Sequence, residues 1–152
     1  MAHVLIVEDD DHKLDVLVAT LHSVVPDAEV QLVTSVSTAV RAVNSQSFDL
    51  IVLDMALPSH EAVVGGGAPM SQLTGGLELL FELQSLARQD PCVIVTQYPE
   101  IEICGEFYPL KLASKAIEER YETRVLGCLE YTDANSDWRV ELANIFGAIC
   151  ES

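Results

Sequence analysis

Residues 48–54 read Phe-Asp-Leu-Ile-Val-Leu-Asp, and this stretch decides the fold of the chain. It is almost entirely apolar, as is typical of a strand covered on both faces, and it brings the carboxylate of Asp54 to the point where the strand ends. Two shorter apolar runs, residues 4–7 and 92–95, have the same character. They are too short and too rich in β-branched residues for helices, so we expect buried strands.

Strand and helix patterns alternate five times along the chain. The strands are expected at residues 3–8, 29–34, 48–54, 92–96 and 125–131, and the helices at 12–25, 36–46, 76–88, 108–122 and 137–150. Such alternation predicts an α/β fold in which a parallel sheet lies between two layers of helices. Because crossovers between parallel strands are right-handed, we expect a doubly wound, five-stranded, flavodoxin-like sheet.

Two segments interrupt this rhythm. Residues 55–75 hold three glycines in succession at 65–67 and a further Gly-Gly pair at the end, and they predict a long, exposed, glycine-rich loop. Residues 97–106 contain Pro99 and Gly105 and predict a second irregular segment. The helix at 76–88 that separates them is expected to turn Phe81 inward with its leucines.

Composition narrows the class of protein. The 152 residues are most simply a single domain spanning 1–152, and acidic residues outnumber basic ones by 24 to 8, for a net charge of −16. A surface this negative disfavours binding to nucleic acid or anionic lipid.

No apolar run reaches the roughly 20 residues of a membrane span, and no signal peptide is evident at the N-terminus. The widely spaced cysteines are typical of a cytoplasmic protein with reduced thiols.

The predicted strands end in polar residues. Glu8 and Asp9 follow the first strand, Asp54 closes the third and Thr96 closes the fourth. Carboxyl ends of parallel strands share one edge of a sheet, so these groups are expected to lie together. Clustered carboxylates suit a hard cation such as Mg²⁺, and an aspartate beside it can attack phosphorus. Any one of these acids alone is more simply a solvated or helix-capping residue, a role we expect for Asp10 or Asp11.

The chain resembles the receiver domain of response regulators (CheY-like) over nearly its whole length. The resemblance is carried by residues 4–10 (Val-Leu-Ile-Val-Glu-Asp-Asp), 49–54 with Leu57-Pro58, 75–80 (Gly-Gly-Leu-Glu-Leu-Leu) and 93–96 (Val-Ile-Val-Thr). Each piece is weak alone, and their order and spacing make the match specific. The family's fold is a five-fold repeat of strand and helix around a parallel sheet.

The resemblance implies a role for each candidate residue. Asp54 would be the phospho-acceptor and Thr96 the switch hydroxyl. Glu8 and Asp9 would form the acidic pair, and Mg²⁺ would be held by these residues, Asp54 and the backbone carbonyl of Ala56. The phosphoryl donor would be a histidine kinase or phosphotransfer protein of a two-component phosphorelay. A downstream protein would bind the face formed by the fourth helix, fifth strand and fifth helix, where Lys111, Lys115, Arg120 and Arg124 concentrate basic charge; a homodimer is left open.

One departure from the family bears directly on function. Receivers carry a lysine at the end of the fifth strand that pairs with the phosphoryl group, but the last lysine of this chain is Lys115, in the predicted fourth helix. Residues 130–132 (Glu-Tyr-Thr) stand there instead, and an inward Glu130 would add repulsion. The long loop after Pro58, read as a lid, a partner-binding flap or a tolerated insertion, is a second departure. Gln97, which follows Thr96 where the family has a small residue, is a third.

These observations leave three functions open. In the first, the chain is a stand-alone, non-enzymatic signalling module that is phosphorylated on Asp54 with Mg²⁺ and acts through protein–protein contacts. In the second, it is an atypical pseudo-receiver that binds partners without phosphorylation. The third, a Mg²⁺-dependent phosphohydrolase, is remote, because Ala56 stands where such enzymes place a second aspartate.

Overall fold

A computed structural model of the chain describes residues 2–60, 71–72 and 75–150. Its main sheet contains five parallel strands in the order β2-β1-β3-β6-β9. These strands are β1 (His3–Val7), β2 (Glu29–Val33), β3 (Leu50–Leu53), β6 (Cys92–Thr96) and β9 (Val125–Glu130). The helices are α1 (Asp11–Val24), α2 (Val36–Ser45), α3 (Gly75–Ser85), α4 (Leu110–Tyr121) and α5 (Asp137–Cys150). The predicted α/β, doubly wound, five-stranded parallel fold is confirmed.

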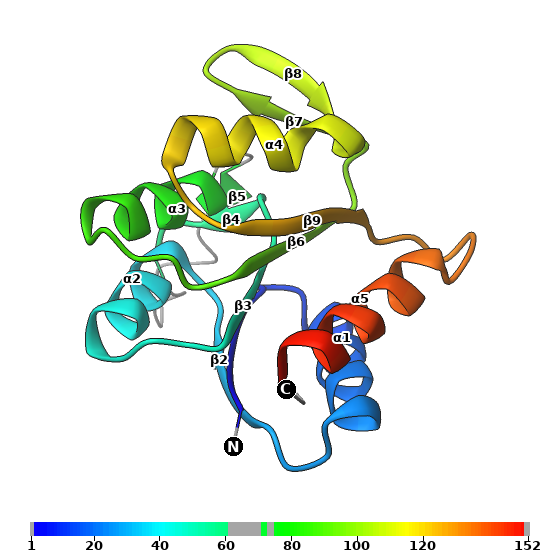
Figure 1. Cartoon of the computed structure of the whole chain (residues 1–152). Coiled ribbons are helices and arrows are strands. Elements are labelled where there is room, and N and C mark those ends of the chain that lie inside the picture. The colour runs from blue at the N-terminus through cyan, green and yellow to red at the C-terminus, as the bar shows by residue number, and fades with distance from the viewer. Residues whose placement is uncertain (1, 61–70, 73–74, 151–152) are drawn as a thin grey trace, which may run out of the picture.

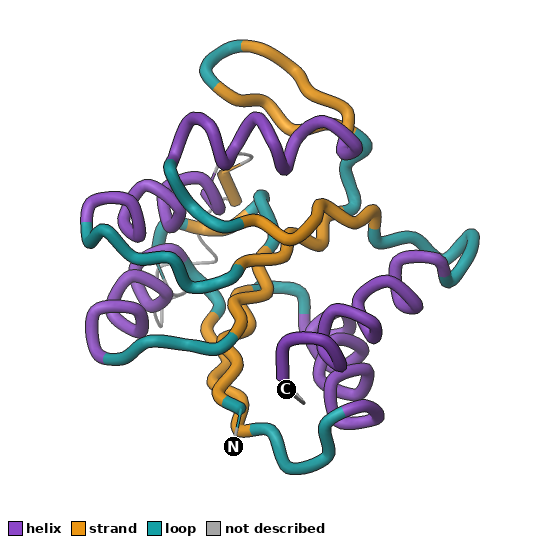
Figure 2. The backbone as a smooth tube through the Cα atoms, viewed as in Figure 1, coloured by secondary structure: helices purple, strands orange, loops and turns teal. Residues whose placement is uncertain are grey.

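The helices form two layers around the sheet (Figures 1 and 2). Helices α1 and α5 pack together on one face, and α2, α3 and α4 cover the other. Each layer buries its own hydrophobic cluster against the sheet. β3 and β6 are buried along their whole length, which explains why their sequences are continuously apolar rather than alternating. The central strands are therefore held rigidly, and so are the residues at their ends.

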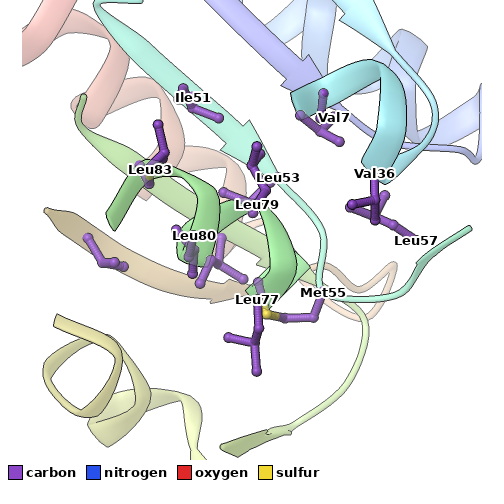
Figure 3. Packing of buried hydrophobic residues seen from close by; sticks show 14 of the residues in the cluster. Val7, Val36, Ile51, Leu53, Met55, Leu57, Leu77, Leu79, Leu80 and Leu83 are labelled. Carbon is purple, nitrogen blue, oxygen red and sulfur yellow. The ribbon is translucent and has the colours of Figure 1, made fainter. Parts of the chain in front are cut away.

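The cluster beneath α3 extends past the end of β3 (Figure 3). Met55 and Leu57, which follow Asp54, are almost fully buried among side chains of β3 and α3 such as Leu53 and Leu79. The chain therefore leaves the sheet through a packed segment, and Asp54 lies between two anchored stretches. The prediction that residues 55–75 form an exposed loop is wrong for this first part, while residues 61–70 and 73–74 lie outside the described residues.

Two short antiparallel pairs add to the main sheet. β4 (Leu57–Pro58) pairs with β5 (Ser71–Gln72), and β7 (Glu100–Ile103) pairs with β8 (Glu106–Pro109) in a hairpin that lies against α4 (Figure 1). The irregular segment predicted at 97–106 is thus largely a hairpin. It is anchored because Ile101 and Ile103 alternate into the core, while the glutamates beside them face solvent.

Helix α3 also differs from its prediction in one residue. Phe81, expected to face inward, is 63% exposed, whereas the leucines of the helix, Leu77, Leu79, Leu80 and Leu83, are buried.

A salt bridge anchors the start of β3. Asp90 is buried and accepts hydrogen bonds from the guanidinium of Arg88 and from the backbone N–H of Phe48. Arg88 also donates to the carbonyls of Val43 and Gln46 at the end of α2. Burial by itself raises the pKa of Asp90, but these hydrogen bonds outweigh it and hold that pKa below the ordinary value of 3.8.

We predict that Asp90→Asn destabilises the fold by about 1–2 kcal/mol at pH 7, since hydrogen bonds to the charged carboxylate are lost. The folded-state pKa is lowered, so the contribution is present above pH 3.8 and disappears as pH falls through the folded value. Urea unfolding at pH 7 and at stepped acid pH should show the two proteins converging in acid. Asp27→Asn, at an exposed turn, is the control, and its free energy of unfolding should differ little from that of wild type at every pH. Parallel curves for Asp90→Asn and wild type at all pH values would contradict this account.

Among the helices that the structure describes, none combines the length and apolar character that crossing a bilayer requires.

Candidate functional site

Glu8 opens the site at the end of β1. Its side chain is almost fully buried, and Oε2 accepts the backbone N–H groups of Asp9 and Asp10 at 3.0 and 3.2 Å. Burial raises the pKa of Glu8 to about 7; the ammonium of Lys13 opposes this shift, and the neighbouring carboxylate of Asp54 adds to it. The carboxyl group is thus held in one orientation by the backbone that enters α1.

Asp54 follows β3, and its side chain is also buried. Its backbone N–H donates to the carbonyl of Val7 on β1, and Oδ1 lies 3.4 Å from the N–H of Ala56. The two carboxylates therefore come from adjacent parallel strands at the same edge of the sheet, as predicted. Buried carboxylates this close repel each other unless a cation lies between them.

That cation is Lys13, in the first turn of α1. Its Nζ lies 2.6 Å from Oε1 of Glu8 and 3.1 Å from Oδ2 of Asp54, and it donates to the carbonyl of Val95 on β6 at 2.7 Å. The carbonyl of Val95 accepts a hydrogen bond from the ammonium, and the two carboxylates pair with its charge. The side chain is 5% exposed, so the ion pairs are shielded from water.

Helix α1 fixes the position of Lys13. Asp10 is the N-cap, as one of the two sequence alternatives predicted, and its side chain accepts the N–H of Lys13 at 2.9 Å. Lys13 then begins the stripe that continues through Leu17 and Leu21 at intervals of four residues, all buried. Sequence reasoning missed Lys13 as a functional residue. The available signal was a lysine in register with an apolar helical stripe, five residues after the acid at the end of a strand.

Thr96 closes β6 and is fully buried. Its hydroxyl lies 3.3 Å from the N–H of Tyr98, and its carbonyl accepts the N–H of Tyr131 just beyond β9. A pocket of about 190 Å³ opens beside it, lined in part by Met55, Tyr98 and Phe107. The hydroxyl therefore lies between the end of the sheet and the β7–β8 hairpin.

Asp9 does not join the buried group. Its side chain is exposed, whereas Glu8 and Asp54 are buried around Lys13. Within residues 2–60, 71–72 and 75–150, no three His, Cys, Asp or Glu side chains lie close enough together to hold a metal ion. The carboxylate oxygens suit Mg²⁺ in their chemistry, but the ammonium of Lys13 contacts two of them. Magnesium at these oxygens would have to share them with Lys13 or displace it.

The end of β9 also lacks the expected charge. Glu130 is exposed, so it does not add repulsion inside the site. The ring of Tyr131 lies under Lys13 instead, with Nζ 5.4 Å from its centroid, within reach of a cation–π interaction. Tyr131 in turn contacts the ring of Trp138 on α5 at 4.8 Å between centroids.

Glycines bring α3 against the segment that carries Asp54. The N–H of Gly76 donates to the carbonyl of Met55 at 2.9 Å. A Cβ at position 76 would lie 2.5 Å from the backbone oxygen of Asp54 and would also meet the end of the Met55 side chain. Only glycine permits this approach without a shift of backbone.

The profile of the family described as "Response regulator receiver domain" matches residues 4–113. The chain belongs to this family. A curated relative, the Detocs response regulatory protein DtcB of Vibrio alginolyticus, is 39% identical over 139 residues, which cover 90% of this chain and 93% of DtcB. The order of strands in the sheet, 2-1-3-4-5 when only its own strands are counted, is the receiver fold.

Solved receiver structures share this fold at low identity. One is the receiver domain of the sensor histidine kinase PA1611 from Pseudomonas aeruginosa, with a magnesium ion in its active site cleft (TM-score 0.62, 21% identity, 99% of this chain and 98% of that one). Another is the response regulator TrrA of Thermotoga maritima in complex with Mg²⁺-BeF (TM-score 0.60, 17% identity, 96% and 99%). Receiver relatives therefore bind Mg²⁺, and the chain is a receiver-type module of two-component signalling.

We predict that Gly76→Ala destabilises the protein by about 1–3 kcal/mol, because its methyl group forces the Asp54–Met55 backbone and α3 apart. Gly127→Ala on β9 is the matched control, since the nearest atom to a Cβ there is Leu129 Cδ2 at 3.8 Å. Urea unfolding of both variants and wild type gives the measurement. Equal stability of Gly76→Ala and Gly127→Ala would show that the close approach is not a constraint.

Proposed function

We propose that the chain is a single-domain receiver, residues 1–152, that accepts a phosphoryl group on Asp54 and signals by binding another protein. The observation that carries the proposal is the placement of Asp54. Its buried carboxylate stands at the carboxyl edge of the sheet beside Glu8 and a cation. The donor would be a histidine kinase or phosphotransfer protein, the usual partners of this family. The name of DtcB, a response regulatory protein, supports the same class of role.

The phosphoryl transfer uses few groups of this chain. A carboxylate oxygen of Asp54 attacks phosphorus, and the bond from phosphorus to the donor's imidazole nitrogen breaks, with its electron pair leaving on that nitrogen. Magnesium, when bound, would neutralise charge on the transferring group, held by Glu8, Asp9, Asp54 and the carbonyl of Ala56. Thr96 would donate its hydroxyl to a phosphoryl oxygen. The protein itself catalyses no further turnover.

The output face is proposed on α4, β9 and α5. Four exposed basic residues lie in and just after α4, although the chain as a whole has a net charge of −16. They are Lys111, Lys115, Arg120 and Arg124. Opposite charges steer association and fix orientation, so this face suits an acidic surface on a downstream protein.

A specific observation also favours the second candidate, a pseudo-receiver. Lys13 already pairs with both Glu8 and Asp54, and no lysine follows β9, so the buried carboxylates have a counter-ion without phosphate or metal. Such a pocket can serve a protein whose conformation is fixed and whose partners bind without phosphorylation. Direct measurement of the phosphoryl adduct separates the two.

We expect incubation with acetyl phosphate and Mg²⁺ to add the mass of one phosphoryl group to the wild-type chain, and Asp54→Asn to abolish the gain. Intact-mass spectrometry follows the adduct, and its loss on treatment with hydroxylamine identifies an acyl phosphate and distinguishes it from adventitious modification. Trp138 fluorescence during titration with Mg²⁺ and beryllofluoride is a second readout, because its ring contacts Tyr131 beside Lys13.

Asp49→Asn, at an exposed acid of the segment before β3, is the matched control and should label like wild type. Magnesium binding without any adduct would favour the pseudo-receiver. Steady release of phosphate from phosphomonoesters would overturn both in favour of a hydrolase.

A further inference from the structure

A phosphoryl group on Asp54 would need a positive charge close to it. It would bring about two negative charges into a pocket that also buries Glu8. In the family, a lysine at the end of the fifth strand supplies that charge, and here no lysine follows Lys115 in the sequence. The three later arginines do not substitute for it. Arg120 is exposed on α4, Arg124 precedes β9 at the far end of the strand, and Arg139 lies over the ring of Trp138.

The structure assigns this role to Lys13. We propose that its ammonium, reaching in from α1, pairs with the phosphoryl group on Asp54 and replaces the lysine that the family carries on the fifth strand. The inference rests on the proposed function, since it concerns the same carboxylate. Nζ of Lys13 already lies 3.1 Å from Oδ2 of Asp54, one of the two oxygens able to attack phosphorus.

The contacts of Lys13 place its charge where the transferring group would arrive. The carbonyl of Val95 and Oε1 of Glu8 hold the ammonium from β6 and β1, and Asp54 occupies the third donor from β3. When Asp54 becomes an acyl phosphate, its carboxylate charge is lost and a phosphoryl oxygen becomes the stronger acceptor for that donor. The other two contacts can persist, so the ammonium needs little displacement to follow the charge.

Tyr131, one of the three residues at the end of β9 where the family's lysine is expected, supports this substitution. Its ring lies beneath the ammonium, with Nζ 5.4 Å from the centroid, and its backbone N–H is bound to the carbonyl of Thr96. The aromatic ring stabilises a cation that comes from the opposite side of the pocket.

The test compares Lys13→Gln and Lys13→Arg with wild type. Gln retains a hydrogen-bond donor but no charge, whereas Arg retains the charge. At saturating Mg²⁺ and acetyl phosphate, we expect Lys13→Gln to form the Asp54 adduct about tenfold or more slowly, and Lys13→Arg to stay closer to wild type. Beryllofluoride, read by Trp138 fluorescence, should bind Lys13→Gln correspondingly more weakly. Lys115→Met, at an exposed lysine of α4, is the control for loss of a positive charge.

A second readout separates a phosphoryl-binding role from a purely structural one. Removing the ammonium leaves the carboxylates without their counter-ion, so Lys13→Gln should bind Mg²⁺ more tightly while it is labelled more slowly. A structural collapse would weaken both. If Lys13→Gln does not fold, Lys13→Met, which keeps the length of the side chain and removes its charge, must show the same slow labelling.

The outcomes distinguish the two proposals. Wild-type chain that gains no Asp54-dependent mass overturns the proposed function and this inference together. Wild-type chain that is labelled, with Lys13→Gln labelled equally fast and binding beryllofluoride equally well, overturns the role of Lys13 alone. Slow labelling with weakened Mg²⁺ binding assigns Lys13 a structural role and overturns the inference as well.

Discussion

The ion pairs of Lys13 with Glu8 and Asp54 are the interaction on which the candidate site depends. Two carboxylates buried side by side would repel each other, and removing one partner from a buried ionic group typically costs about 3–5 kcal/mol. Here one ammonium pairs with both carboxylates and also donates a hydrogen bond to the carbonyl of Val95. The Nζ atom of Lys13 thereby links α1 to residues at the ends of β1 and β3 and to β6.

That arrangement is possible because several weaker constraints agree. Asp10 caps α1 so that Lys13 falls in its first turn, facing the sheet. Glu8 is oriented by two backbone N–H groups, and Asp54 is fixed by buried residues on both sides. The close approach of Gly76 then presses α3 against the backbone after Asp54. The buried charges are therefore held by a preorganised backbone, which limits the reorganisation that binding a phosphoryl group would require.

The main sheet was predictable because β3 and β6 are short, continuous apolar runs, and the polar groups at their ends had to meet at one edge. The β7–β8 hairpin was missed because Pro99 and Gly105 were read as signs of irregular chain. The evidence in the sequence was the alternation of Ile101 and Ile103 with glutamates, followed by a glycine at 105. In the structure, Cys104 and Gly105 both have positive φ and form the turn of the hairpin.

Lys13 was missed for a different reason. Lysines are rarely buried, so Lys13 was not counted among the site residues, and the cation was sought at the end of the fifth strand, where the family carries it. Nothing in helix periodicity alone says whether a lysine on the buried face reaches a carboxylate or snorkels to solvent. Only the packing of α1 on the sheet decides it. The acids were thus predictable from the ends of strands, but their counter-ion was not.

The element that carries the cation determines which parts of the protein could change conformation when Asp54 is phosphorylated. A lysine on the fifth strand would couple the phosphoryl group directly to β9. Lys13 would instead couple it to the first turn of α1. α1 packs against α5, and the ring of Tyr131 touches both the ammonium and Trp138. A change in the charge on Asp54 would therefore reach α5 through α1 and two aromatic rings, with β9 involved through Tyr131 rather than through a charge of its own. Because any such coupling needs a difference in contacts between the two states, the contacts of Lys13 are where that difference would arise.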